Sequence, residues 1–124
     1  AIAAADRVRH RLGGGWRQAG VLAAAALYAL EHHVARLADD HARARRIAEA
    51  LERGGVARPT HRVETNLVVF RVDPAWGTAQ KFVDALAARG VLVAATGPDS
   101  GRLVTHLDVD DRDVTAVCEV VNEL

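Results

Sequence analysis

Two arginines follow glycine-rich stretches, and their guanidinium groups are the side chains of this sequence best suited to bind an anion. Arg17 comes shortly after the three consecutive glycines Gly13–Gly15, and Arg102 comes directly after the turn cluster Gly97–Gly101. A guanidinium binds a planar carboxylate or a phosphate through two parallel hydrogen bonds, which a lysine cannot do. On the residues alone, both could equally be solvated surface arginines, because a glycine loop near an arginine and isolated exposed charges are common.

His106 is a third candidate. The alternation of a strand from Arg102 to Val109 places Arg102 and His106 on the same side, so both could face one cleft. A structural histidine held by hydrogen bonds explains the residue equally well. Asn66 is a polar residue inside an otherwise apolar strand, and we therefore expect its amide to bond to loop backbone.

Metal and thiol chemistry have little support in this sequence. His32, His33 and His41 come without an HExxH motif or a cysteine pair, and the carboxylates near them are typical of a solvated helix, so we expect no metal site. The single cysteine, Cys118, lies among valines, which favours a buried or half-buried thiol without a catalytic role. One cysteine cannot form an internal disulfide, so we expect a reducing, cytoplasmic environment.

Hydrophobic periodicity and turn residues predict an α+β fold. The expected helices are a basic one at 1–12, an alanine-rich one at 16–30, and amphipathic ones at 31–53, 77–89 and 111–124. The expected strands are at 63–72, 91–95 and 102–109, with a loop around Pro59. Together they predict a small three-stranded, largely antiparallel sheet covered by helices and preceded by a long alanine-rich helical arm.

Capping residues and side-chain patterns add detail to this fold. Gly54-Gly55 should end the 31–53 helix, the Gly97–Gly101 turn should join the last two strands as a hairpin, and Asp110 should cap the final helix. We expect one core, whose members are Leu51, Val68, Phe70, Leu92, Leu103, Leu107 and Val117.

The charge balance and the alanine-rich run indicate which partners to expect. The chain carries 16 basic and 16 acidic residues, which gives no electrostatic case for nucleic acid or an anionic membrane. The uncharged segment Ala19–Leu30 is far shorter than the ~20 residues that a membrane span needs. This segment is apolar on nearly every face, and the rest of the chain is too small to cover it. Its burial therefore requires an absent domain or a partner subunit.

Several blocks of the sequence resemble one enzyme family. The residues LGGGWRQAGVLAAA, from Leu12 onward, resemble the GGGMRQAG block of the low-specificity L-threonine aldolases, with Trp16 where the family usually has methionine. The other similar blocks, in the same order, are RLADDHARAR from Arg36, ETNLV from Glu64, GVLV from Gly90 and RLVTHLDV from Arg102. The resemblance covers almost the whole chain, but only about the C-terminal third of such an enzyme.

The resemblance implies a fold and site roles. These aldolases depend on pyridoxal 5'-phosphate and have the aspartate-aminotransferase (type I) fold, so residues 1–30 would be interface helices at the end of the large domain and residues 31–124 the C-terminal small domain. Arg102 would bind the substrate carboxylate, and Arg17 would reach the cofactor phosphate from a neighbouring subunit. Homodimers or homotetramers are expected.

The resemblance also implies what this polypeptide lacks. The lysine that binds the cofactor, the base stacked on its ring and the acid at its pyridine nitrogen belong to the N-terminal large domain, while the only lysine here, Lys81, lies on an ordinary amphipathic helix. No catalytic residue is therefore expected in this chain, which alone should be inactive. The whole enzyme would cleave L-threonine and L-allo-threonine to glycine and acetaldehyde. Two alternatives stay open: a sibling β-eliminating lyase of the same fold, or a non-catalytic interaction domain.

Overall fold

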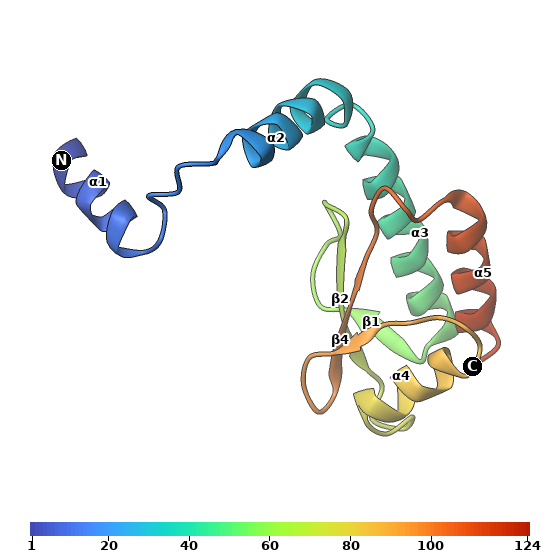
Figure 1. Ribbon diagram of the computed structural model, residues 1–124. Helices are drawn as coiled ribbons and strands as arrows, with labels where there is room; N and C mark the ends of the chain where they lie inside the picture. Colours follow the sequence, from blue (N-terminus) through green and yellow to red (C-terminus); the bar gives the residue numbers. More distant parts are fainter. The chain divides into compact units, whose positions relative to one another are not determined.

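The computed structural model describes residues 1–124, which form two compact units, Ala1–Ala35 and Arg36–Leu124 (Figure 1). The first unit holds two helices, α1 (Ile2–Arg11) and α2 (Gly20–His32). A glycine turn follows α1, and Gly13 has φ +82°, a left-handed conformation that glycine adopts without strain. Neither helix contains a buried residue. The alanine-rich segment thus forms the expected helix, and its apolar surface is not buried within the first unit.

The second unit is an α+β layer. Its elements in chain order are α3 (Leu37–Gly54), β1 (Ala57–Pro59), β2 (Leu67–Val72), α4 (Ala79–Ala87), β3 (Ala94–Ala95), β4 (Ser100–Val104) and α5 (Asp111–Asn122). The strands form one antiparallel sheet in the order β1-β2-β4-β3. Helices α3 and α5 pack side by side, and α3 and α4 both contact β2 (Figure 1).

The sheet has four strands, so the prediction of three was wrong. The extra strand, β1, lies in the segment predicted to be a loop around Pro59. It is an edge strand, paired only with β2, and an edge position accommodates a proline that cannot donate to the ladder. The N–H of Thr60 continues the pairing by donating to the carbonyl of Val69 at 2.9 Å.

Caps and turns fix the boundaries of the elements. Gly55 ends α3 in a left-handed conformation with φ +71°, and Asp110 caps the start of α5, both as the sequence predicted. Asp113 completes a reciprocal capping box with Asp110. The predicted hairpin between β3 and β4 is present, closed by the N–H of Thr96 donating to the carbonyl of Ser100 at 2.9 Å.

The core lies between the helices and one face of the sheet. Phe70 of β2 meets Phe82 of α4 edge to face at 5.6 Å, and Trp76 also meets Phe82 edge to face at 5.6 Å. Four of the predicted core residues are buried and Val117 is half-buried against them; the four are Leu51, Val68, Phe70 and Leu103.

Leu92 and Leu107 were wrongly predicted to be buried, since they are 86% and 57% exposed. Strand β4 ends at Val104 and the chain then turns, so the inward alternation that the sequence suggested does not reach Leu107. Leu92 precedes the two-residue strand β3 and lies outside the sheet.

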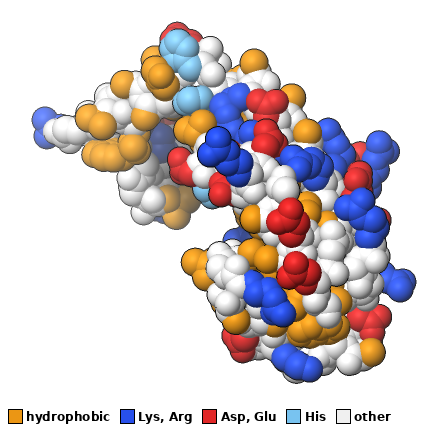
Figure 2. All heavy atoms as spheres, turned by 90° about the vertical axis from the view of Figure 1, so that its right-hand side faces the viewer, with side chains coloured by type: hydrophobic (Ala, Val, Ile, Leu, Met, Phe, Trp, Pro, Cys, Tyr) orange, Lys and Arg blue, Asp and Glu red, His pale blue; other side chains and the backbone are white.

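The face of the second unit that carries α3 and α5 has charges of both signs. Figure 2 shows arginine and lysine side chains interspersed with aspartate and glutamate across the molecule from this side.

No helix in the structure is both long enough and apolar enough to cross a membrane.

Candidate functional site

Arg102 occupies the middle of β4, on the face of the sheet opposite the helices. Its register partners are Val69 of β2 and Ala94 of β3, and its side chain is exposed while its neighbours Gly101 and Leu103 are buried. The strand alternation predicted from the sequence therefore holds at this position. None of the ion pairs in the structure involves Arg102, so its guanidinium is available to a ligand.

Gly101 sets the position of this arginine. A Cβ at Gly101 would lie 2.4 Å from Cζ of Phe70 and 3.1 Å from the carbonyl oxygen of Ala94, so only glycine lets β4 approach the core this closely. Close packing against Phe70, and not only the preceding turn, therefore requires a glycine directly before Arg102.

Arg102 and His106 line the same open hollow of about 350 Å³. Its other lining residues are apolar: Leu92, Val93, Ala94, Leu103 and Val104. Exposed Leu92 belongs to this wall, which gives it a place outside the core. His106 lies beyond the end of β4, and its Nδ1 accepts a hydrogen bond from the N–H of Asp108 at 3.3 Å. The neutral ring then carries its proton on Nε2.

Arg17 belongs to the first unit. It is exposed in the turn of residues 17–19, between the glycine stretch and the start of α2. Helix α2 has no side-chain cap and no acidic residue in its first turn, and Arg17 forms no ion pair within the chain. Free amide N–H groups at a helix start, next to a guanidinium, suit an anion such as a phosphate.

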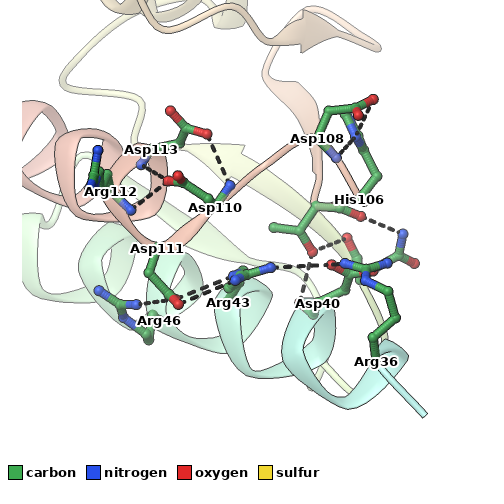
Figure 3. A network of polar contacts seen from close by, with 12 residues as sticks. Arg36, Asp40, Arg43, Arg46, His106, Asp108, Asp110, Asp111, Arg112 and Asp113 are labelled. Atoms are coloured by element: carbon green, nitrogen blue, oxygen red, sulfur yellow. Dashed lines mark hydrogen bonds and ion pairs between the residues drawn. The ribbon is translucent and has the colours of Figure 1, made fainter. Parts of the chain in front are cut away.

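A network of ion pairs lies below the end of β4, and the sequence did not predict it (Figure 3). Asp40 of α3 is only 2% exposed, although it is a charged residue. Arg36 binds its carboxylate through two hydrogen bonds of 2.9 and 2.6 Å, and Arg43 lies 3.8 Å away. The spacing of these residues at i−4 and i+3 from Asp40 is the signal that could have revealed the cluster.

The network extends to the start of α5. Arg43 and Arg46 reach the carboxylate of Asp111 at 3.2 and 3.0 Å. The hydrogen bond from Arg43 lowers the pKa of Asp111, and the same bond raises the pKa of Arg43. The backbone N–H groups of Asp113 and Arg112 lower the pKa of the capping carboxylate of Asp110.

Asn66 and Thr105 connect this network to the site. As predicted, the amide of Asn66 bonds to loop backbone: its Nδ2 donates to the carbonyl of Thr105 at 2.7 Å. Asn66 precedes β2, which begins at Leu67. Thr105 is 1% exposed, and its hydroxyl donates to the carbonyl of Asp40 at 2.8 Å. Thr105 is a residue beside the site that the sequence did not predict.

The surroundings of Cys118 and Lys81 indicate no chemical role for either residue. Cys118 is half-buried, and burial raises the pKa of its thiol, which disfavours a reactive thiolate. No group of three or more histidine, cysteine, aspartate or glutamate residues could hold a metal ion. Lys81 lies exposed on α4, where its Nζ donates to the carbonyl of Trp76 at 3.0 Å and sits over the indole ring.

The residues present fit pyridoxal 5'-phosphate in part. Arg17 and the uncapped start of α2 have the donors that its phosphate requires. The lysine that would bind its aldehyde has no counterpart, since Lys81 is already bonded to Trp76 on the surface of α4.

Comparison with known proteins places these features in one family. Residues 1–75 match the family model described as beta-eliminating lyase. The chain is 43% identical over 119 residues to the "probable low-specificity L-threonine aldolase 2" of Arabidopsis thaliana, with 94% of this chain and 33% of the relative covered. It is 41% identical over 116 residues to the low-specificity L-threonine aldolase of Escherichia coli K12, with the same coverage.

A third relative has a different name. The chain is 30% identical over 126 residues to "alanine racemase TOXG" of Cochliobolus carbonum, with 95% of this chain and 31% of the relative covered. The chain thus spans about a third of the length of the curated relatives that it matches. With more than half of its residues within the family model, this chain belongs to the beta-eliminating lyase family.

Proposed function

We propose that this chain contributes the substrate-carboxylate and cofactor-phosphate contacts of a pyridoxal-phosphate-dependent aldolase, which cleaves L-threonine and L-allo-threonine to glycine and acetaldehyde. The observation that carries the proposal is Arg102: an unpaired guanidinium on an open sheet face, at a hollow with apolar walls. The cofactor, when bound, supplies the electron sink for breaking the Cα–Cβ bond.

Arg102 binds the amino acid carboxylate in this proposal. Its planar fork pairs with both carboxylate oxygens, and the apolar residues that line the hollow lower the local dielectric, which strengthens the interaction. Such a charge-assisted hydrogen bond contributes about 1.5–3 kcal/mol. Fixing the carboxylate also fixes which substituent of the α-carbon is presented for cleavage.

His106 is proposed as a neighbour of the same substrate. In its neutral form Nδ1 accepts from Asp108, so Nε2 has the proton available to a substrate oxygen. Its place on the hollow of Arg102 supports this role.

Arg17 binds the cofactor phosphate in this proposal, together with amide groups at the start of α2. Its side chain carries no internal ion pair to be broken, and the φ > 0 glycine turn lets another chain approach closely. We propose that the phosphate belongs to the cofactor of a neighbouring subunit in a homodimer or homotetramer. The exposed apolar surface of α2, which includes Leu22, Leu27 and Leu30, supports such an assembly.

The chain by itself is proposed to be inactive, because its only lysine cannot serve the cofactor. The remaining functions would come from a large domain of the same protein. A cytoplasmic location is proposed from the single cysteine, whose half-buried thiol has no partner for a disulfide.

The test is a pair of substitutions in the intact protein. Arg102→Lys keeps the charge but loses the fork, so the KM for L-threonine should rise about ten- to a hundredfold, while the dissociation constant for pyridoxal phosphate changes little. Arg17→Ala should weaken cofactor binding more than substrate binding. The matched control is Arg71→Lys, on β2, because Arg71 already pairs with Asp99 at 3.0 Å and should affect neither quantity.

The opposite pattern would contradict the proposal. If Arg102→Lys leaves threonine kinetics unchanged and releases the cofactor, the two arginines have been assigned the wrong roles.

A further inference from the structure

One buried polar residue next to the proposed site has no role in the proposed function. Thr105 lies between Arg102 and His106, directly after β4 ends at Val104, and is 1% exposed. Buried hydroxyl groups are costly unless they are hydrogen-bonded, so a threonine among apolar neighbours requires an explanation.

Thr105 is held from two sides. Its N–H donates to the carbonyl of Asn66 at 3.0 Å, and its own carbonyl accepts from Nδ2 of Asn66 at 2.7 Å. Its hydroxyl donates to the backbone carbonyl of Asp40 in the first turns of α3 at 2.8 Å. Three hydrogen bonds therefore fix the first residue beyond the strand to the loop before β2 and to a helix.

The helix end of this connection is itself fixed. The carboxylate of Asp40 is buried and bound by both terminal nitrogens of Arg36, and Arg43 lies on its other side, as the close view in Figure 3 shows. A residue anchored by its side chain has little freedom to move its carbonyl. Thr105 thus bonds to a residue of α3 whose own side chain is held by ion pairs.

The backbone from His106 to Val109 is bonded only within its own turn, where the N–H of Asp108 donates to Nδ1 of His106 at 3.3 Å. His106, Leu107 and Asp108 are exposed, and the turn is closed by the N–H of Val109 donating to the carbonyl of His106 at 2.9 Å. The bonds of Thr105 therefore decide where β4 stops and where the His106 side of the hollow begins.

We infer that Thr105 and Asn66 are positioning residues, which hold the end of β4 so that Arg102 and His106 face one substrate. This inference rests on the proposed function of Arg102. The hydroxyl of Thr105 matters because it sets the distance between the strand and α3, and a displacement of about 1 Å at a binding group can cost up to a hundredfold in rate or affinity.

The test compares two substitutions in the intact enzyme. Thr105→Val is nearly isosteric but removes the donor, and Thr105→Ser keeps the donor but removes a methyl group. The carbonyl of Asp40 keeps its hydrogen bond within α3, so Thr105→Val leaves no buried acceptor without a partner. We expect Thr105→Val to raise the KM for L-threonine about tenfold with kcat changed less than about twofold, and Thr105→Ser to restore the KM.

A merely structural role gives a different result. Loss of folded enzyme lowers kcat and leaves the KM unchanged, and would do so for both variants in proportion to their stability. A KM ratio of Val to Ser variants at or below about threefold therefore overturns the inference, and a larger ratio supports it.

Two further measurements separate this inference from the proposal on which it rests. In an Arg102→Lys background, Thr105→Val should add less than about threefold to the KM, because residues that act through one another are not additive. Hydrogen exchange of residues 102–109 should accelerate in Thr105→Val, while the exchange of α4 stays unchanged. If Arg102→Lys leaves the KM for L-threonine unaltered, the proposed function fails. If Arg102→Lys raises the KM but Thr105→Val leaves it unaltered, only the positioning role of Thr105 fails.

Discussion

Replacing Gly101 by alanine should destabilise the second unit and disturb Arg102 at the same time. Gly101 lies in β4 opposite Phe70, and an added Cβ would be 2.4 Å from Cζ and 2.9 Å from Cε2 of that ring. Real Cβ atoms do not approach ring carbons this closely, so either the ring or the strand must move.

The structure indicates the size of the effect. Phe70 is fully buried and packs edge to face against Phe82 at 5.6 Å, so its ring has no free space on the far side. Adding a methyl group to such a core costs about 1–3 kcal/mol. With a urea m-value of about 1 kcal/mol/M, the unfolding midpoint falls by about 1–3 M.

The assay is urea unfolding of the 124-residue chain followed by circular dichroism. The matched control is Gly20→Ala at the start of α2, where no atom lies within 4 Å of the added Cβ, so the midpoint should stay the same or rise. A second variant combines Gly101→Ala with Phe70→Leu, which removes the clashing ring atom; its loss should be smaller than the sum of the two single losses. A free energy for Gly101→Ala within about 0.5 kcal/mol of the unmodified chain would refute the reasoning.

Three further predictions concern the core, the charged network and the thiol. Phe82→Ala should lower the free energy of unfolding by about 3–5 kcal/mol in the same urea assay, because the ring is fully buried and packs against Phe70 and Trp76. A loss under about 1 kcal/mol would show that the neighbouring side chains fill the cavity left by the ring. The pKa of Asp111 is lowered in the folded chain, so the ionised carboxylate stabilises the fold above the ordinary carboxyl pKa, and this stabilisation is lost as the pH falls. The difference in free energy of unfolding between the native chain and Asp111→Asn should therefore shrink between pH 5 and pH 2 in acid titrations. A difference that grows on acidification would contradict this. Cys118, with its raised pKa, should react more slowly with iodoacetamide at pH 8 than a free cysteine does, and an equal or faster rate would show that the thiol is more accessible than its burial implies.

The parts of the fold that the sequence predicted are those decided by local signals. Gly55 has φ +71°, which only a glycine adopts easily, and the carboxylate of Asp110 accepts hydrogen bonds from N–H groups two and three positions later in the chain. Both signals act within one turn, so they are legible without knowing the tertiary structure.

The parts that were missed depend on partners far away in the chain. β1 contains a proline and only three residues, and it becomes a strand because β2 pairs with it. Asp40 looks solvated on its own helix, but it is buried because the end of β4 and Arg36 cover it. Leu107 continues a period-two pattern that the backbone abandons after Val104.

The candidate site follows the same division. Alternation within β4 correctly placed Arg102 on the open face and Leu103 in the core. His106 also lines the hollow of Arg102, although it lies in the turn beyond the end of β4. Thr105, which connects them to α3, carries no local signal, since its bond to Asp40 joins residues far apart in sequence. The roles of Arg17, Arg102 and His106 remain predictions.

The most direct test of the central claim is the product analysis of the intact protein that carries this chain. With pyridoxal phosphate present, it should release acetaldehyde and glycine in equal amounts from both L-threonine and L-allo-threonine. Release of a 2-oxo acid and ammonia with no aldehyde, or interconversion of amino acid enantiomers without cleavage, would contradict the proposed aldolase and assign the carboxylate site of Arg102 to a different reaction.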